Sequence, residues 1–188
     1  MREQEAPQLP PYDVRRLTDA DAATIQDLHV RCTAFVELVE GRPPTAGEGL
    51  DLLHAKPTSV KDEDKLVFPL FEDGRMIGAL DLLRDYPDPH TWYLGLLMLS
   101  PSTRNHGLGA QTYEAVRRWV AAKGGQAVRL VVQAQNNAAL RFWERQGFVV
   151  IGTTTQEAAG RTNEVFRMEH RLTTLAIAPV ADGDVEEV

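Results

Sequence analysis

The sequence predicts a single α/β domain of the α+β type, built from about seven strands and about four helices. Its 188 residues fit one domain, and 43% hydrophobic residues suffice for a core without disulfides or metals. Segments with strand and helix periodicity follow one another from residue 12 to residue 172. We therefore expect the domain at residues 12–172, with flexible tails at residues 1–11 and 173–188.

The first helices are predicted from their start signals. After a strand at residues 12–17, Thr18-Asp19-Ala20-Asp21 has the arrangement of a capping box, which satisfies free amides in a first helical turn. Apolar residues at helical spacing then continue to Val39. A second capping box at residues 45–48 opens a short helix that ends before Pro57.

A β-hairpin is predicted in the middle of the chain. Residues 65–71 and 76–83 form apolar runs joined through Asp73-Gly74, a dipeptide that suits turn positions with positive φ. Pro69 has no N–H for the sheet, so we expect a bulge or irregularity there. A fourth strand follows at about residues 91–99.

The second half of the chain alternates helices and strands. Gly124-Gly125 marks the end of its first helix, and the short apolar run after it is typical of a strand buried on both faces. The predicted elements are a helix at 108–123, a strand at 127–132, a helix at 138–146, and strands at 148–155 and 164–172.

Composition excludes several classes of protein. The net charge is −7, but four acidic residues lie in the last seven positions, so the rest of the chain is nearly balanced, which argues against a nucleic-acid-binding surface. Cys32 is the only cysteine, and no Cys/His cluster has zinc-ligand spacing, so we expect no disulfide, no metal and a reducing cytoplasm. No apolar run approaches the roughly 20 residues that span a bilayer, so no membrane partner is expected.

The most informative segment lies between the fourth strand and the following helix. It contains Arg104-Asn105-His106-Gly107-Leu108-Gly109-Ala110. Glycines let backbone N–H groups converge on an anion, and a helix start adds its positive dipole end, so the segment suits a pyrophosphate. The pattern alone is not specific, because Gly-x-Gly also occurs in plain turns. The dinucleotide-binding fingerprint is excluded, because Thr112 stands where it needs a third glycine.

Two motifs carry a resemblance to a known family. Arg104-x-x-Gly107-x-Gly109 resembles the Gln/Arg-x-x-Gly-x-Gly/Ala signature of the GNAT superfamily of N-acetyltransferases. The downstream segment Asn136-x-x-Ala139-x-x-Phe142-Trp143 resembles the partner motif of that superfamily. The two motifs occur in the right order, separated by a predicted helix and strand, so together they are specific.

The resemblance implies acetyl-CoA as co-substrate and a mixed, mostly antiparallel sheet whose fourth and fifth strands splay apart to admit it. The pantetheine arm would lie in this gap, and the pyrophosphate would lie on the glycine-rich loop. Asn136 would bond the pantetheine, although a residue before a helix could also be a simple N-cap. The implied cofactor-binding residues are Leu97, Met98, Leu99, Arg104, Asn105, His106, Gly107, Leu108, Gly109, Ala110, Asn136, Ala139 and Trp143.

The resemblance also implies direct attack of a neutral amine on the thioester, with a backbone N–H of the fourth strand holding the oxyanion. Many relatives carry a tyrosine as general acid seven residues after the motif asparagine, where this chain has Trp143. An indole N–H cannot transfer a proton at neutral pH. Some relatives have a glutamate five residues before that asparagine, where this chain has Val131.

The candidate catalytic residues are Asp81 and His90. Asp81 interrupts an apolar strand, where a carboxylate is costly unless it is paired or faces a cleft. It is therefore either the base or counter-ion of the acceptor amine, or the partner of a nearby basic group. His90 titrates near neutrality, but it is also explained as a surface turn residue. Tyr86, Trp92 and Tyr93 lie near His90 in the sequence and could line the acceptor end.

Two functions remain open at this point. The first is acetyl-CoA-dependent N-acetylation of a primary amine on a small molecule or peptide. The alternative is a non-catalytic acyl-CoA-binding module, which would share the fold and the cofactor site. The sequence decides neither the acceptor nor whether the protein forms a homodimer.

Overall fold

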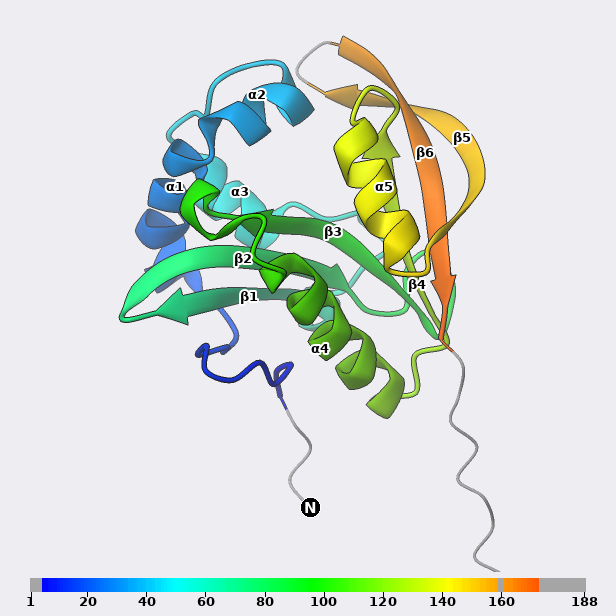
Figure 1. Cartoon of the computed structure of the whole chain (residues 1–188), viewed down its shortest axis with the longest axis horizontal. Coiled ribbons are helices and arrows are strands. Elements are labelled where there is room, and N and C mark those ends of the chain that lie inside the picture. Colours follow the sequence, from blue (N-terminus) through cyan, green and yellow to red (C-terminus); the bar gives the residue numbers. More distant parts are fainter. Residues whose placement is uncertain (1–4, 159–160, 173–188) are drawn as a thin grey trace, which may run out of the picture.

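The computed structural model describes residues 5–158 and 161–172, and it contains a six-stranded sheet with helices on both faces (Figure 1). The helices are α1 Ala22–Arg31, α2 Thr33–Glu40, α3 Glu48–His54, α4 Leu108–Ala122 and α5 Asn137–Arg145. The strands are β1 Lys65–Glu72, β2 Arg75–Leu83, β3 Thr91–Leu99, β4 Ala127–Gln133, β5 Val149–Ala158 and β6 Arg161–Arg171.

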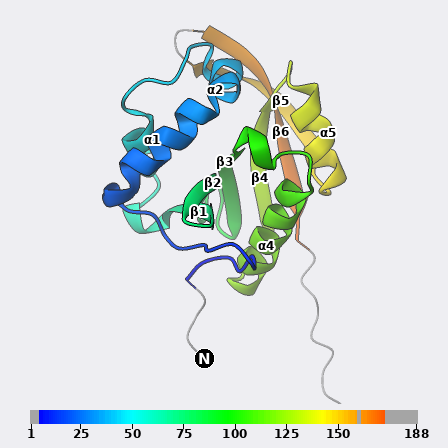
Figure 2. The same ribbon diagram turned by 60° about the vertical axis from the view of Figure 1, so that its left-hand side comes forward.

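The strands are arranged in the order β1-β2-β3-β4-β6-β5. All neighbours are antiparallel except β3 and β4, which are parallel. Helices α4 and α5 pack on one face of the sheet, and α1 and α3 pack on the other face over β1 to β3 (Figure 2). Each face therefore has its own hydrophobic core, and the larger one lies under α4 and α5.

The strand predicted at residues 12–17 is wrong, which reduces seven strands to six. Asp13 and Phe71 form an isolated bridge, and the N–H of Leu17 donates to the carbonyl of Val67 at 2.8 Å. Between these contacts the chain passes Pro69, which has no N–H to donate. The ladder is interrupted there, so the segment lies along β1 without becoming a strand.

The first predicted helix is divided in two, which gives five α-helices. The backbone of Cys32 leaves the helical region at φ −100° and ψ 24°, and the hydroxyl of Thr33 donates to the carbonyl of Val30 at 2.6 Å. A threonine side chain that bonds the backbone competes with regular helix formation. The start signal is confirmed, since the N–H of Thr18 donates to the Asp21 carboxylate at 2.9 Å, but the first three residues form a 3₁₀ turn.

The predicted hairpin is confirmed. Asp73 and Gly74 have φ of 48° and 75°, and they connect β1 to β2. The expected irregularity is present, but it falls between Leu70 and Phe71 rather than at Pro69. In the second half of the chain the predicted elements are present, with β5 and β6 extended toward each other by three residues.

Residues 5–11, the described part of the tail expected at residues 1–11, pack on the domain. Ala6 and Leu9 are buried and belong to the larger core. The tail predicted at residues 173–188 lies outside the described residues. Among the described helices, none has the length and apolar character needed to cross a bilayer.

Candidate active site

The predicted splay of the fourth and fifth strands is confirmed as a gap in pairing between β3 and β4. The two strands pair only from Thr91 with Ala127 to Tyr93 with Arg129. Beyond this point β3 pairs with β2 alone. One edge of β3 therefore has main-chain groups without a strand partner over its second half.

The direction of these main-chain groups follows from one hydrogen bond. The N–H of Ser100 donates to the carbonyl of Ile77 at 2.8 Å, so Ser100 faces β2. Bonding alternates along an antiparallel pair, so Leu97 and Leu99 face the splay and Met98 faces β2. Of the three β3 residues predicted to contact the cofactor, Leu97 and Leu99 keep that placement. The main chain of Met98 is turned away from the splay, and its side chain is buried under α1.

A β-bulge lies at the start of the splay. Asp81 pairs with Leu96 and Leu82 pairs with Leu94, which leaves Gly95 as the extra residue on β3. Bulges bend a strand and redirect its backbone groups, and they are frequent next to active sites. The exposed Gly95 therefore marks where an N–H of β3 can be aimed at a reacting group.

The glycine-rich loop leads directly into α4. Gly107 is the N-cap of this helix with φ 81°, a conformation that side chains rarely adopt. The first-turn amides of Leu108, Gly109 and Ala110 have no acceptor within the helix, which is the general property of helix starts that bind anions. Asn105 and His106 are exposed beside them, and Arg104 Nε donates to the carbonyl of Leu99 at 2.9 Å.

The second glycine of the motif has a packing role. A Cβ at Gly109 would lie 3.2 Å from Cζ of Phe142 and 3.6 Å from Cδ1 of Leu99. Gly109 therefore lets α5 approach α4 at the mouth of the splay. The sequence pattern predicted only that this glycine helps to bind the pyrophosphate. Its contact with Phe142 was not predicted.

The downstream motif has structural roles in α5. Asn136 is the N-cap, and its side-chain oxygen accepts from the N–H of Ala139 at 3.0 Å, which confirms the capping interpretation. Ala139 is half-buried against the larger core. Trp143 is buried in an aromatic cluster with Tyr113 and Phe148, whose ring centroids lie 5.5 and 5.2 Å away.

Asp81 is paired with a buried lysine. Its Oδ1 lies 2.8 Å from Nζ of Lys65, in a geometry that makes an ion pair but no aligned hydrogen bond. Burial raises the pKa of Asp81, and the ammonium of Lys65 opposes this shift. The other oxygen, Oδ2, lies against Gly95, where a Cβ would be 2.6 Å away. The carboxylate thus lies directly beneath the bulge.

Two tyrosines lie next to the Lys65–Asp81 pair. Tyr93 belongs to the last β3–β4 pair, and its ring packs edge-on against Tyr86 with centroids 5.6 Å apart. Burial, Tyr86 and Asp81 together raise the pKa of Tyr93 to about 12. Trp92, by contrast, is in the larger core. The pairing of Lys65 with Asp81 was not predicted from the sequence. Its only signal there was a lysine at the start of an apolar strand.

His90 lies at the opposite end of β3 from the phosphate loop. Its side chain is exposed and its backbone N–H donates to the Asp85 carboxylate at 2.7 Å. It borders a surface hollow of about 330 Å³ that also contacts Arg84 and Lys123. This placement favours the turn interpretation of His90.

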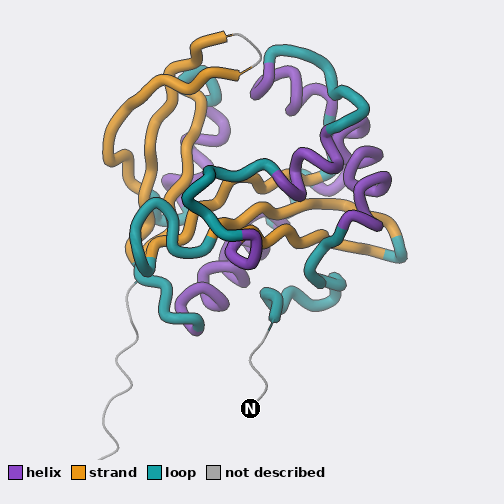
Figure 3. Tube along the Cα trace, turned by 180° about the vertical axis from the view of Figure 1, so that it is seen from behind, coloured by secondary structure: helices purple, strands orange, loops and turns teal. Residues whose placement is uncertain are grey.

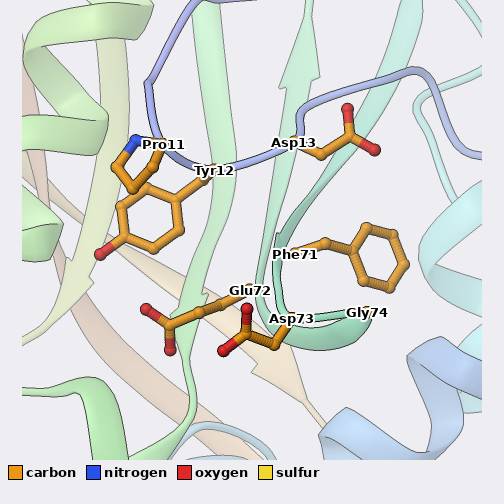
Figure 4. A pocket seen from close by; sticks show the side chains of 7 residues that line it. All are labelled: Pro11, Tyr12, Asp13, Phe71, Glu72, Asp73 and Gly74. Carbon is orange, nitrogen blue, oxygen red and sulfur yellow. The ribbon is translucent and has the colours of Figure 1, made fainter.

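Another hollow, of about 500 Å³, lies at the β1–β2 hairpin (Figure 4). It is lined by Pro11, Tyr12, Asp13, Phe71, Glu72, Asp73 and Gly74, none of which is near the β3–β4 gap in sequence or pairing. Within the described ranges no group of His, Cys, Asp and Glu side chains has the arrangement of a metal site.

Comparisons with known proteins agree with this geometry. The family model of the acetyltransferase (GNAT) family matches residues 24–148. The ribosomal-protein-S18-alanine N-acetyltransferase of Escherichia coli superposes with a TM-score of 0.66 at 17% identity, covering 86% of this chain and 94% of that one. No curated protein matches the chain.

Two further structures have the same fold. An acetyltransferase from Thermus thermophilus has a TM-score of 0.65 at 23% identity and covers 87% of this chain and 99% of its own. The spermidine N-acetyltransferase of Vibrio cholerae, solved with CoA and spermine, has a TM-score of 0.66 at 19% identity, covering 86% and 95%.

The splayed sheet and the glycine start of α4 define a fold that binds an acyl-CoA thioester. The family model covers most of the chain, so the protein belongs to the acetyltransferase (GNAT) family and is an N-acetyltransferase with acetyl-CoA as its co-substrate.

Proposed function

We propose that the protein acetylates a primary amine of a small molecule or peptide by direct attack of the amine on acetyl-CoA. The observation that supports this most is the continuity of the site. The unpaired edge of β3 ends at Leu99, and the loop after it leads to the Gly107 N-cap of α4. Main-chain donors and acceptors thus continue from a strand edge to a helix start.

These groups fit acetyl-CoA. Main-chain groups of Leu97 and Leu99 would bind the pantetheine, and the amides from Asn105 to Ala110 would bind the pyrophosphate. The bound thioester supplies an electrophilic carbonyl and a thiol leaving group. At the bulge near Gly95, a backbone N–H of β3 would stabilise negative charge on the carbonyl oxygen.

Asp81 is the proposed base or counter-ion of the acceptor amine. An alkylammonium must lose its proton before it attacks, and a carboxyl with a raised pKa accepts a proton better than an ordinary aspartate. Because the extra residue of the bulge is Gly95, no side chain at this position covers the Asp81 carboxylate. Trp143 is packed in the core, so neither it nor the more deeply buried Tyr113 is proposed as a general acid.

The decisive measurement is CoA thiol release from acetyl-CoA across a panel of amines. Because the similar structures include a spermidine N-acetyltransferase and a ribosomal-protein-S18-alanine N-acetyltransferase, the panel should contain polyamines, aminoglycosides, amino acids and peptides that begin with alanine. We expect acceptor-dependent release with at least one class. Silence across the panel, with acetyl-CoA binding confirmed in the same preparation, would instead favour a non-catalytic acyl-CoA-binding module.

The role of Asp81 has its own test. Asp81→Asn keeps the shape of the side chain and removes the charge, so turnover should fall about 10²-fold, the usual contribution of a general base. Asp88→Asn is a matched control, because Asp88 is an exposed carboxylate in the turn before β3. Full turnover by Asp81→Asn with every accepted amine would remove Asp81 from the mechanism.

A further inference from the structure

The half of the sheet formed by β4, β6 and β5 packs against a helix along one face, whereas only the end of α2 reaches the other face, where Nε2 of Gln133 donates to the carbonyl of Val39 at 2.6 Å. Helix α5 packs on the face that carries Phe166 and Met168 (Figure 1). Figure 3 shows these strands from behind, with α5 on their far side. The opposite face, called the open face here, continues the surface beneath the bulge, since Asp81 also points away from the α4–α5 core.

Arg167 lies on this open face. It stands between Phe166 and Met168 in β6, and successive side chains of a strand point to opposite faces. It pairs with Val131 of β4 and with Gly152 of β5. A Cβ at Gly152 would lie 2.7 Å from Nη2 of Arg167, so the guanidinium lies close to the backbone of β5.

Among the arginines of the open face whose side chains the structure describes (Arg129, Arg167 and Arg171), Arg167 has no acidic partner. The other two are paired: Arg129 of β4 pairs with Asp88 and Glu169 at 2.7 Å each, and Arg171 of β6 pairs with Glu169 at 3.0 Å. The side chain of Arg167 is exposed, and the hydroxyl-bearing Thr154 is the next residue of β5 on the same face. Arg167 is thus an uncompensated positive charge on the open face.

The position of Arg167 along the sheet matches the reacting centre. The last β3–β4 pair is Tyr93 with Arg129, so Gly95 and Val131 each lie two residues beyond it. Val131 pairs with Arg167. The bulge and Arg167 are therefore at one level, with β4 between them. Paired strands lie about 4.8 Å apart and β3 has already separated from β4 here, so the two positions are at least about 10 Å apart.

We propose that Arg167 binds the C-terminal carboxylate of the acceptor, and that the acceptor is a short peptide of at least three residues. An extended chain spans about 3.3–3.6 Å per residue, so at least three residues are needed to cover this separation. A free amino acid holds its amine and carboxylate too close together. Arginine binds a carboxylate through two parallel hydrogen bonds. This inference rests on the proposed N-acetylation at the bulge.

Binding of tetraalanine and its C-terminal amide to the CoA-bound protein tests this subsite by calorimetry. We expect the acid to bind about tenfold more tightly than the amide, the factor expected for loss of a charge-assisted hydrogen bond. Arg167→Gln should remove the preference, and Arg167→Lys should keep part of it. Arg145→Gln removes an exposed arginine from α5 on the other face and should change nothing. Equal affinities, no binding of either ligand, or a preference that survives in Arg167→Gln would overturn the proposal.

Turnover separates this proposal from the proposed function. If tetraalanine binds through Arg167 but no amine of the panel is acetylated, the carboxylate site stands and the proposed acetylation fails. If small amines are acetylated while tetraalanine and its amide bind alike, the acetylation stands and the role of Arg167 fails. If both the carboxylate site and the acetylation hold, Arg167→Gln should raise KM for tetraalanine. The same variant should leave kcat unchanged for a small amine that carries no carboxylate.

Discussion

Oδ2 of Asp81 occupies the space where a side chain on residue 95 would begin, because a Cβ there would lie 2.6 Å from it. Residue 95 is also the extra residue of the β3 bulge, at the point where β3 and β4 separate. A single glycine therefore allows both the close approach of the carboxylate and the opening above it. This relationship can be tested directly.

Gly95→Ala should destabilise the protein by about 1–3 kcal/mol, the usual cost of overpacking a well-packed site. Chemical unfolding measures this loss. In an Asp81→Ala background the contact is absent, so adding Gly95→Ala should cost much less. Equal costs in both backgrounds would show that the alanine is accommodated without meeting Asp81.

The Lys65–Asp81 pair should be strongly coupled. Lys65→Met leaves a buried carboxylate without its partner and should cost about 3–5 kcal/mol in unfolding free energy. The double variant Lys65→Met/Asp81→Leu replaces both charges with apolar groups and should recover most of that loss. A double variant as unstable as the sum of the two single variants would contradict the pairing.

The two motif glycines should respond differently to alanine. Gly107→Ala forces a side chain into φ 81° and should cost about 1 kcal/mol whatever its neighbours. Gly109→Ala presses on Phe142, so Phe142→Leu should relieve it. Thermal unfolding of the single and double variants checks this, and rescue of Gly107→Ala by the same leucine is not expected.

Trp143→Phe should lower stability by about 1–3 kcal/mol and leave kcat unchanged. The indole fills space between Tyr113, Phe142 and Phe148 at centroid distances of 4.7–5.5 Å, and a smaller ring leaves a cavity. A fall in kcat larger than the loss of folded protein would show that the indole N–H takes part in the reaction.

Stability should fall as pH is lowered through the pKa of an unfolded histidine, about 6.5. Burial, assisted by Arg117, lowers the pKa of His170, whose Nδ1 lies 2.8 Å from the hydroxyl of Tyr113. The unfolded chain therefore takes up this proton first, so the contribution of His170 is full above pH 6.5 and is lost below it. The melting temperature between pH 8 and pH 5 should show this slope in the wild type but not in His170→Gln. The exposed His90 provides the control, since His90→Asn should retain the slope.

The sequence predicted most of the elements because their signals are local. The Asp73-Gly74 turn, the capping boxes and the glycine start of α4 each depend on a few neighbouring residues, and all are present. The strand at residues 12–17 failed because its pairing depended on Pro69, more than 50 positions away. The long first helix failed because a hydroxyl at Thr33 competed with the backbone at the end of α1.

By itself, the sequence determined the family, the order of most elements and the glycine-rich loop proposed to bind acetyl-CoA, because two motifs at fixed spacing carry that information. Only the tertiary structure decided the partners of single side chains. It paired Asp81 with Lys65, placed Gly95 over that carboxylate, packed Trp143 into an aromatic cluster and left Arg167 on an open face. Such partners come from strand register and sheet order, which join residues far apart in the chain and leave no periodic pattern in the sequence.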